Sequence, residues 1–164
     1  MPTINSRACV VNGTPVDKVF SNGNQVYGRN LLKGTSNLQD YTLSGAHWQS
    51  GSQSSNSKTI SIPGTPGKSY TYSAIVKTAT FNCYPEIEFY DSNKKWISNS
   101  TPYPMTGIGV RKITAVAPAN TAFLVVLIVL QNPPDSQTVV FNSEKLESGS
   151  IATTWTPAPE DILK

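Results

Sequence analysis

Prolines and glycines divide this sequence into short segments, and their spacing constrains the fold more than any other feature. The 164 residues include twelve prolines and eleven glycines, and no segment keeps the 3.6-residue apolar period of an amphipathic helix. Between these breaks apolar and polar residues alternate, as in half-buried strands, over residues 58–62, 69–77, 85–91, 96–98, 109–116 and 137–146, and a seventh strand segment, 121–131, is almost wholly apolar. The pattern predicts an all-β chain, a jelly-roll-like β-sandwich of two antiparallel sheets, with no helix longer than two turns.

One segment, Ala122–Leu130, is apolar at every position. Nine residues are far too few to cross a bilayer as a helix, which takes roughly 20, so we expect no membrane partner. A run rich in β-branched residues is typical of a central strand covered on both faces, which would also shield Leu127 and Val129. The predicted core comprises Tyr72, Val76, Ile87, Phe89, Leu124, Val126, Ile128, Val140 and Leu146.

Charge and cysteine content exclude several other classes of protein. Charged residues make up 14% of the chain, and the net charge of +3 comes from scattered lysines rather than a basic run. We therefore expect no nucleic acid partner. Cys9 and Cys83 lack the spacing of a metal site; one disulfide is possible, but two free buried thiols are favoured. Polar residues interrupt any apolar run over 1–11, so no signal peptide is expected there.

The chain divides into three predicted parts. Residues 1–29 hold short strand candidates and an Asn22-Gly23 hairpin turn, which predicts a β-arm or linker segment. The open alternative is that these strands join the sandwich. Residues 30–157 form the predicted sandwich. Residues 158–164 are expected to be an extended, solvated exit linker, because prolines precede acidic residues there.

Several motifs resemble those of one protein family. Asn-Leu-Leu-Lys-Gly-Thr-Ser at 30–36, followed by Trp48, resembles the opening of jelly-roll carbohydrate-binding modules, and 67–77 resembles their central strand. Residues 141–161, ending in Ala-Thr-Thr-Trp-Thr-Pro-Ala-Pro-Glu-Asp, are similar to the ends of such modules in tail or baseplate proteins, of the evolved distal tail protein type, from siphophages of lactic-acid bacteria. Residues 11–19 and 24–30 resemble the linking segments of those proteins.

The resemblance implies a function and a setting. It implies a non-catalytic carbohydrate-binding module that attaches the virion, through its tail or baseplate, to cell-wall polysaccharide of a Gram-positive host. Other phage tail proteins would be partners. It also implies that some members hold a structural calcium ion, for which Glu147 and the carbonyls of 33–36 are candidates; no other cofactor is expected. The alternative is a structural baseplate insert domain that mediates protein–protein contacts.

The strand over 84–90 offers the candidate saccharide site. Ile87 and Phe89 share one parity and are assigned to the core, so the other face carries the carbohydrate-binding candidates Tyr84, Glu86, Glu88 and Tyr90. Aromatic faces for C–H groups and planar polar side chains for hydroxyls are what a sugar site needs. The open alternative is a solvated sheet face whose acids pair with lysines such as Lys77 across strands 69–77 and 85–91.

Three further aromatic residues are candidates for the rim of that site. Trp96 follows a turn, and Tyr103 lies between two prolines on a predicted loop, where function is disproportionately located. Trp48 precedes a loop rich in serine and glutamine. It is a candidate sugar-stacking residue, with a core anchor as the alternative.

The sequence predicts that the chain is not an enzyme. Glycoside hydrolysis needs two carboxylates, and the separation of Glu86 and Glu88 does not exclude them. The predicted open face argues against the raised pKa that a catalytic acid needs. The single histidine, His47, and the absence of a Gly-x-Ser-x-Gly motif leave little for a serine or cysteine hydrolase.

Overall fold

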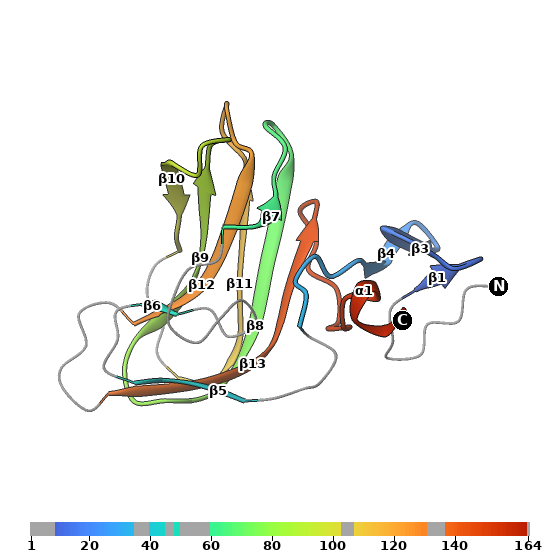
Figure 1. Cartoon of the computed structure of the whole chain (residues 1–164). Coiled ribbons are helices and arrows are strands. Elements are labelled where there is room, and N and C mark those ends of the chain that lie inside the picture. The colour runs from blue at the N-terminus through green and yellow to red at the C-terminus, as the bar shows by residue number, and fades with distance from the viewer. Residues whose placement is uncertain are drawn as a thin grey trace.

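The fold is a β-sandwich, as predicted. The computed structural model describes residues 9–34, 40–44, 60–102, 107–130 and 137–163, together with the backbone of 48–49. Two sheets of antiparallel strands pack face to face, and the described chain contains one short helix (Figure 1). No helix of this part is long and apolar enough to span a membrane.

Each sheet is named here after its long inner strand. The β9 sheet has the order β10 (Trp96–Ser100), β9 (Cys83–Tyr90), β12 (Phe123–Leu130) and β6 (Trp48–Gln49), and β7 (Ile62–Pro63) also pairs with β12. The β8 sheet has the order β11 (Gly109–Val116), β8 (Ser69–Ala79), β13 (Thr138–Ser148) and β5 (Tyr41–Ser44). Six of the seven predicted strand segments are strands in the structure; of the seventh, 58–62, only Ile62 lies in a strand, and 58–59 lie outside the described residues.

The main core lies between the two sheets. It contains the predicted residues Tyr72, Val76, Ile87, Phe89, Leu124, Val126, Ile128 and Leu146, each no more than 2% exposed. Leu127 and Val129 are buried in a second cluster on the other face of β12. The prediction that this strand is covered on both faces is confirmed.

One core assignment, Val140, was wrong. Val140 is only half-buried, whereas its neighbour Val139 is fully buried. The pairing of β13 with β8 shifts between Asn142 and Lys145, where Ser143 has a φ of 55°. This bulge changes which parity faces inward, so an assignment counted back from Leu146 points the wrong way before it.

Strands 69–77 and 85–91, which the open alternative pairs through Lys77, are not neighbours. β8 and β9 are consecutive strands but belong to opposite sheets. Lys77 therefore does not lie across from Glu86 or Glu88. Its Nζ is 2.7 Å from Oδ2 of Asp40, which directly precedes β5 of the same sheet.

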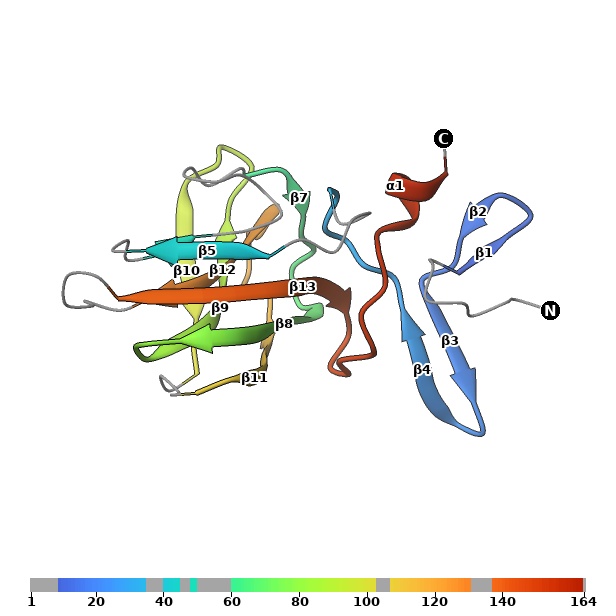
Figure 2. The same cartoon turned by 90° about the horizontal axis from the view of Figure 1, so that it is seen from below.

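The first part of the chain forms two small hairpins. β1 (Val10–Val11) pairs with β2 (Thr14–Pro15), and β3 (Lys18–Ser21) pairs with β4 (Asn24–Gly28). The predicted turn closes the second hairpin, with positive φ at both Asn22 and Gly23. Among the described residues these strands pair with neither sandwich sheet, and they lie beyond the end where β13 stops (Figure 2). The proposed boundary at residue 29 stays a prediction.

The end of the chain differs from the extended, solvated segment expected. Residues 156–159 are buried, and α1 (Pro159–Ile162) forms one helical turn. Proline at the first helical position and acidic residues in the first turn favour this start. Arg29 pairs with both Glu160 and Asp17, and Asp161 Oδ1 accepts a hydrogen bond from the Gly34 amide at 3.0 Å. These contacts hold the turn against the segment that enters the sandwich.

Candidate functional site

The predicted site lies on the outer face of the β9 sheet. Direct pairing brings side chains of three strands to this face, because paired residues of neighbouring strands point the same way. They are Trp96 and Asn99 from β10, Tyr84, Glu86, Glu88 and Tyr90 from β9, and Phe123, Val125, Leu127 and Val129 from β12. A row that alternates tyrosine and glutamate thus runs beside a wholly apolar row.

This face is not open, which corrects the prediction. Tyr84, Glu86, Glu88 and Tyr90 retain only 5–7% of their exposure. Tyr84 and Tyr90 pack in the second cluster with the apolar row of β12, and Ile60 contributes to it. Alternation along β9 alone could not show this, because it says nothing of the neighbouring strand. β12 places apolar residues on both of its faces.

The two buried carboxylates have neutral hydrogen-bond donors. Tyr90 Oη donates to Glu88 Oε2 at 2.8 Å, and Asn99 Nδ2 donates to Glu86 Oε2 at 3.1 Å. Burial and, to a smaller extent, the hydrogen bond to Glu88 raise the pKa of Tyr90 well above its ordinary value. Burial and Glu86 also raise the pKa of Tyr84. Both phenols are therefore protonated donors near neutral pH.

The accessible end of this face is aromatic. Trp96 lies opposite Tyr90, which in turn lies opposite Phe123, so three aromatic residues cross three strands. Trp96 is 53% exposed and Phe123 is half-buried. The ammonium of Lys94 lies 5.9 Å from the Phe123 ring centroid. Asn99 is exposed on the same strand as Trp96. We call this group the aromatic end.

Of the other two rim candidates, Trp48 and Tyr103, the structure describes only the backbone of Trp48. The backbone of Trp48 pairs with Val129 in β6, which places the residue at the edge of the same sheet. Its side chain lies outside the described residues, as do Tyr103 and His47. Their predicted roles stay predictions.

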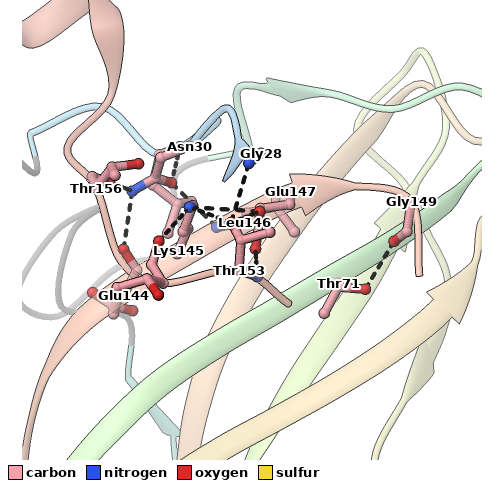
Figure 3. Close-up of polar contacts among 12 residues, drawn as sticks. Gly28, Asn30, Thr71, Glu144, Lys145, Leu146, Glu147, Gly149, Thr153 and Thr156 are labelled. Atoms are coloured by element: carbon pink, nitrogen blue, oxygen red, sulfur yellow. Dashed lines mark hydrogen bonds and ion pairs between the residues drawn. The ribbon is translucent and has the colours of Figure 1, made fainter. Parts of the chain in front are cut away.

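A second polar group, which the sequence did not predict as a unit, lies where β13 ends. Lys145 and Glu147 are fully buried, with Nζ and Oε1 3.5 Å apart (Figure 3). Lys145 Nζ also donates to Thr153 Oγ1 at 2.8 Å and to the Thr154 carbonyl at 2.7 Å. Burial lowers the pKa of Lys145, and Glu147 opposes that shift. We call this group, together with Asn30 and Glu144, the strand-end cluster.

Asn30 joins three segments within the strand-end cluster. Its Nδ2 donates to the carbonyls of Glu144 and Thr156, both at 3.1 Å. Its Oδ1 accepts from the amides of Leu32 at 3.0 Å and Leu146 at 3.2 Å. Both hydrogens and both acceptor positions of the side-chain amide are used. This saturation gives Asn30 a structural role.

Glu147, the predicted calcium ligand, belongs to this cluster. Its Oε2 accepts from the Thr153 amide at 2.9 Å and its Oε1 from Thr153 Oγ1 at 2.5 Å. Calcium needs six to eight oxygens and no competing cation, whereas here a buried ammonium lies beside one carboxylate. No group of three metal-ligating acidic, histidine or cysteine residues occurs in the described part of the chain. These residues fit a calcium ion poorly, and the ion stays an untested prediction.

No family model matches the chain, and no curated protein matches it. Among solved structures, the chain is similar to the enzymatically active domain of tailspike protein 4 of bacteriophage CBA120, with 9% sequence identity and a TM-score of 0.44. The match covers 81% of this chain but 22% of that one. The β-sandwich that the family resemblance implies is present in this chain, and its phage tail setting remains a hypothesis.

The prediction that the chain is not an enzyme is corrected. This neighbour is described as an enzymatically active domain. Glu86 and Glu88 are also buried, whereas the prediction assumed that they lie on an open face. The likeness is too weak to assign an activity, a substrate or a catalytic residue to this chain.

Proposed function

We propose that this chain is a carbohydrate-binding domain of a phage tail protein and that a saccharide stacks on its aromatic end. The observation that carries the proposal is Trp96, a large aromatic residue that is 53% exposed at one end of a row with Tyr90 and Phe123. An indole left in water contributes little to the stability of a folded domain. An exposed flat ring beside polar groups is suited to the C–H face of a pyranose.

The surroundings of Trp96 supply the polar half of such a site. Asn99 and Lys94 are exposed and lie close to Trp96 in the sequence, so their side chains can reach sugar hydroxyls. Glu88 acts indirectly, since it accepts from Tyr90 Oη and so holds the middle ring of the row. In this arrangement the buried carboxylates position aromatic rings, and the exposed residues contact the ligand.

The tail-protein setting and the ligand class are supported by the motifs at 30–36, 67–77 and 141–161. They favour cell-wall polysaccharide of a Gram-positive host, bound at the cell surface by the virion tail. A shallow single site would hold a sugar with a Kd of about 1 mM, or about −4 kcal/mol. Several copies on one tail would raise the avidity by roughly 10² to 10⁴.

A second candidate function has an observation of its own. Val110 on the edge strand β11 lies directly opposite Ile75 on β8, and both are exposed, at 60% and 39%. Ile108, 72% exposed, precedes the same edge. An apolar group beside an unpaired strand edge suits a protein–protein contact. This supports the structural insert that mediates contacts within a baseplate.

Binding of the labelled full chain to Gram-positive cells and to their purified wall polysaccharide tests both candidates. We expect Trp96→Ala to reduce binding at least tenfold, and Val110→Ser, a matched change at an exposed apolar residue, to leave it unchanged. The carbohydrate proposal fails if the two variants bind alike or if the chain binds no wall polysaccharide. Assay of new reducing ends in the same samples shows whether bound polysaccharide is also cleaved.

A further inference from the structure

A separate pocket lies where the β3–β4 hairpin meets the end of the sandwich. Its volume is about 370 Å³, and it is lined by Lys18 from β3, by Lys68 and Ser69 at the start of β8, and by Ser148, Gly149 and Ser150 at the end of β13. Figure 2 shows the hairpin beyond these strand ends. No residue of the outer face of the β9 sheet contributes to it.

The charge of this pocket is positive and locally unbalanced. Neither the Lys18 nor the Lys68 ammonium forms an ion pair or a side-chain hydrogen bond with any residue that the structure describes. The acids adjacent to the lining residues in sequence are engaged elsewhere. Asp17 pairs with Arg29, and Glu147 accepts from Thr153 and pairs with Lys145. Two cations in one concavity therefore lack a counter-charge among the described residues.

Hydroxyl groups complete the lining. The side chains of Ser69, Ser148 and Ser150 make no hydrogen bond to another described residue, so their O–H groups are free to donate. Two ammonium groups and three hydroxyls around one concavity give a set of donors. Such a set matches the oxygens of a carboxylate or a phosphate, with charge-assisted bonds from the lysines.

Gly149 keeps this arrangement open. Its φ is +107°, its amide donates to the Ser69 carbonyl at 2.7 Å, and its carbonyl accepts from Thr71 Oγ1 at 2.8 Å (Figure 3). A Cβ at this position would lie 2.7 Å from Lys18 Nζ. The absent side chain therefore leaves room for that ammonium against a backbone fixed on both sides.

We propose that this pocket binds an oxyanion, a carboxylate or a phosphate carried by a small polar molecule or by a residue of an acidic polymer. The inference does not rest on the proposed function, because other elements build the pocket. Free lysine ammonium groups attract anions of either kind, and the serine hydroxyls add direction to that attraction.

Titration of the full chain with inorganic phosphate, galacturonate and glucose, followed by NMR, tests this proposal. We expect saturable binding of one or both anions in the millimolar range and none of glucose. Phosphate binding alone identifies a phosphate site, and galacturonate binding alone a carboxylate site. We expect Lys68→Ala and Lys18→Ala each to weaken binding about threefold to tenfold. Lys112→Ala, which removes the same charge from an exposed position of β11, should not change it.

Three results would overturn the proposal. They are no saturable binding of either anion, equal binding of glucose, and a loss in the Lys112 variant as large as in the Lys68 variant. Lys68 is exposed, so its substitution leaves the fold intact and a negative result there cannot be attributed to unfolding. A failure here would not affect the Trp96 test, because the two sites share no residue.

Discussion

The outer face of the β9 sheet and the strand-end cluster each contain two buried carboxylates, but the groups that bond these carboxylates differ. Glu86 and Glu88 lie two residues apart on β9, and Glu144 and Glu147 lie three apart on β13. All four are 7% exposed or less. In the first group the hydrogen-bond donors include neutral groups, Tyr90 and Asn99, beside an apolar row. In the second, Glu147 has a buried lysine and a threonine, and Glu144 Oε1 accepts from Tyr72 Oη at 2.7 Å.

The difference teaches that burial of an acid does not by itself identify a binding site. Lys145, Glu147 and Thr153 bond one another, and Asn30 bonds the backbone of three segments, so their polar capacity is used within the protein. On the β9 sheet, Glu88 instead accepts from Tyr90, which lies opposite the exposed Trp96. Under the proposed function the first group supports recognition, whereas the second holds chain segments together. Substitutions in the two groups should therefore have different consequences.

The largest effect is expected at Lys145. Lys145→Ala leaves the Glu147 carboxylate fully buried without its cation, and breaking a buried pair in this way costs about 3–5 kcal/mol. Urea unfolding measures the loss of unfolding free energy. Lys112→Ala, on the exposed side of β11, should change it by less than about 0.5 kcal/mol. Equal losses in the two variants would show that the strand-end cluster contributes no stability.

A smaller effect is expected on the outer face of the β9 sheet. Glu88→Ala deprives the buried Tyr90 hydroxyl of its acceptor, at a cost of about 1–3 kcal/mol, and loosens the row that supports Trp96. Loss of an exposed glutamate would instead cost about 0.5 kcal/mol or less. Urea unfolding separates the two values, with Lys112→Ala as the control at an exposed residue of β11. A loss as small as that of the control would contradict the buried, stabilising role of Glu88.

The two groups should also differ in their response to alkaline pH. The folded-state pKa of Tyr90 is raised, so the unfolded chain loses this proton first and the contribution of Tyr90 to stability falls as pH rises above about 10. The folded-state pKa of Lys145 is lowered, so its contribution increases as pH approaches the ordinary lysine value. Denaturation of the wild type and of Tyr90→Phe between pH 8 and 11 checks the first sign. A steeper fall in the variant would contradict it.

The smallest effect is expected from metal removal. Because Lys145 lies beside Glu147, excess chelator should leave the melting temperature unchanged. Thermal unfolding with and without added calcium gives the measurement. A rise of several degrees with calcium, lost in Glu147→Gln, would show that the ion displaces the ammonium.

Sequence reasoning located the strands well and the surroundings of their side chains less well. Alternation and turn signals gave every long strand, because pleat and burial repeat every two residues. The short strands β5 and β6 carried too few residues to show a period. The assignment of Val140 failed at a bulge that no sequence pattern marks.

The candidate site shows the same limit. Parity correctly placed Tyr84, Glu86, Glu88 and Tyr90 on one face, but burial depended on β12, whose contribution is non-local. The strand-end cluster depends on Asn30 and Thr156, which are 126 residues apart in the chain. The one available signal was local: Glu144, Lys145 and Glu147 are three charged residues within a strand that is otherwise mostly apolar or neutral.

The bonds of Asn30 have a consequence for how fast the molecule folds. They close a loop that contains nearly the whole sandwich, and proteins dominated by such distant contacts fold slowly, in milliseconds to seconds. The entropy of closing that loop is lost before the bonds compensate for it, so the strand-end cluster should form after the sheets. Asn30→Ala would then accelerate unfolding and leave the folding rate almost unchanged. The cluster would thus form after the transition state of folding and prolong the lifetime of the folded state.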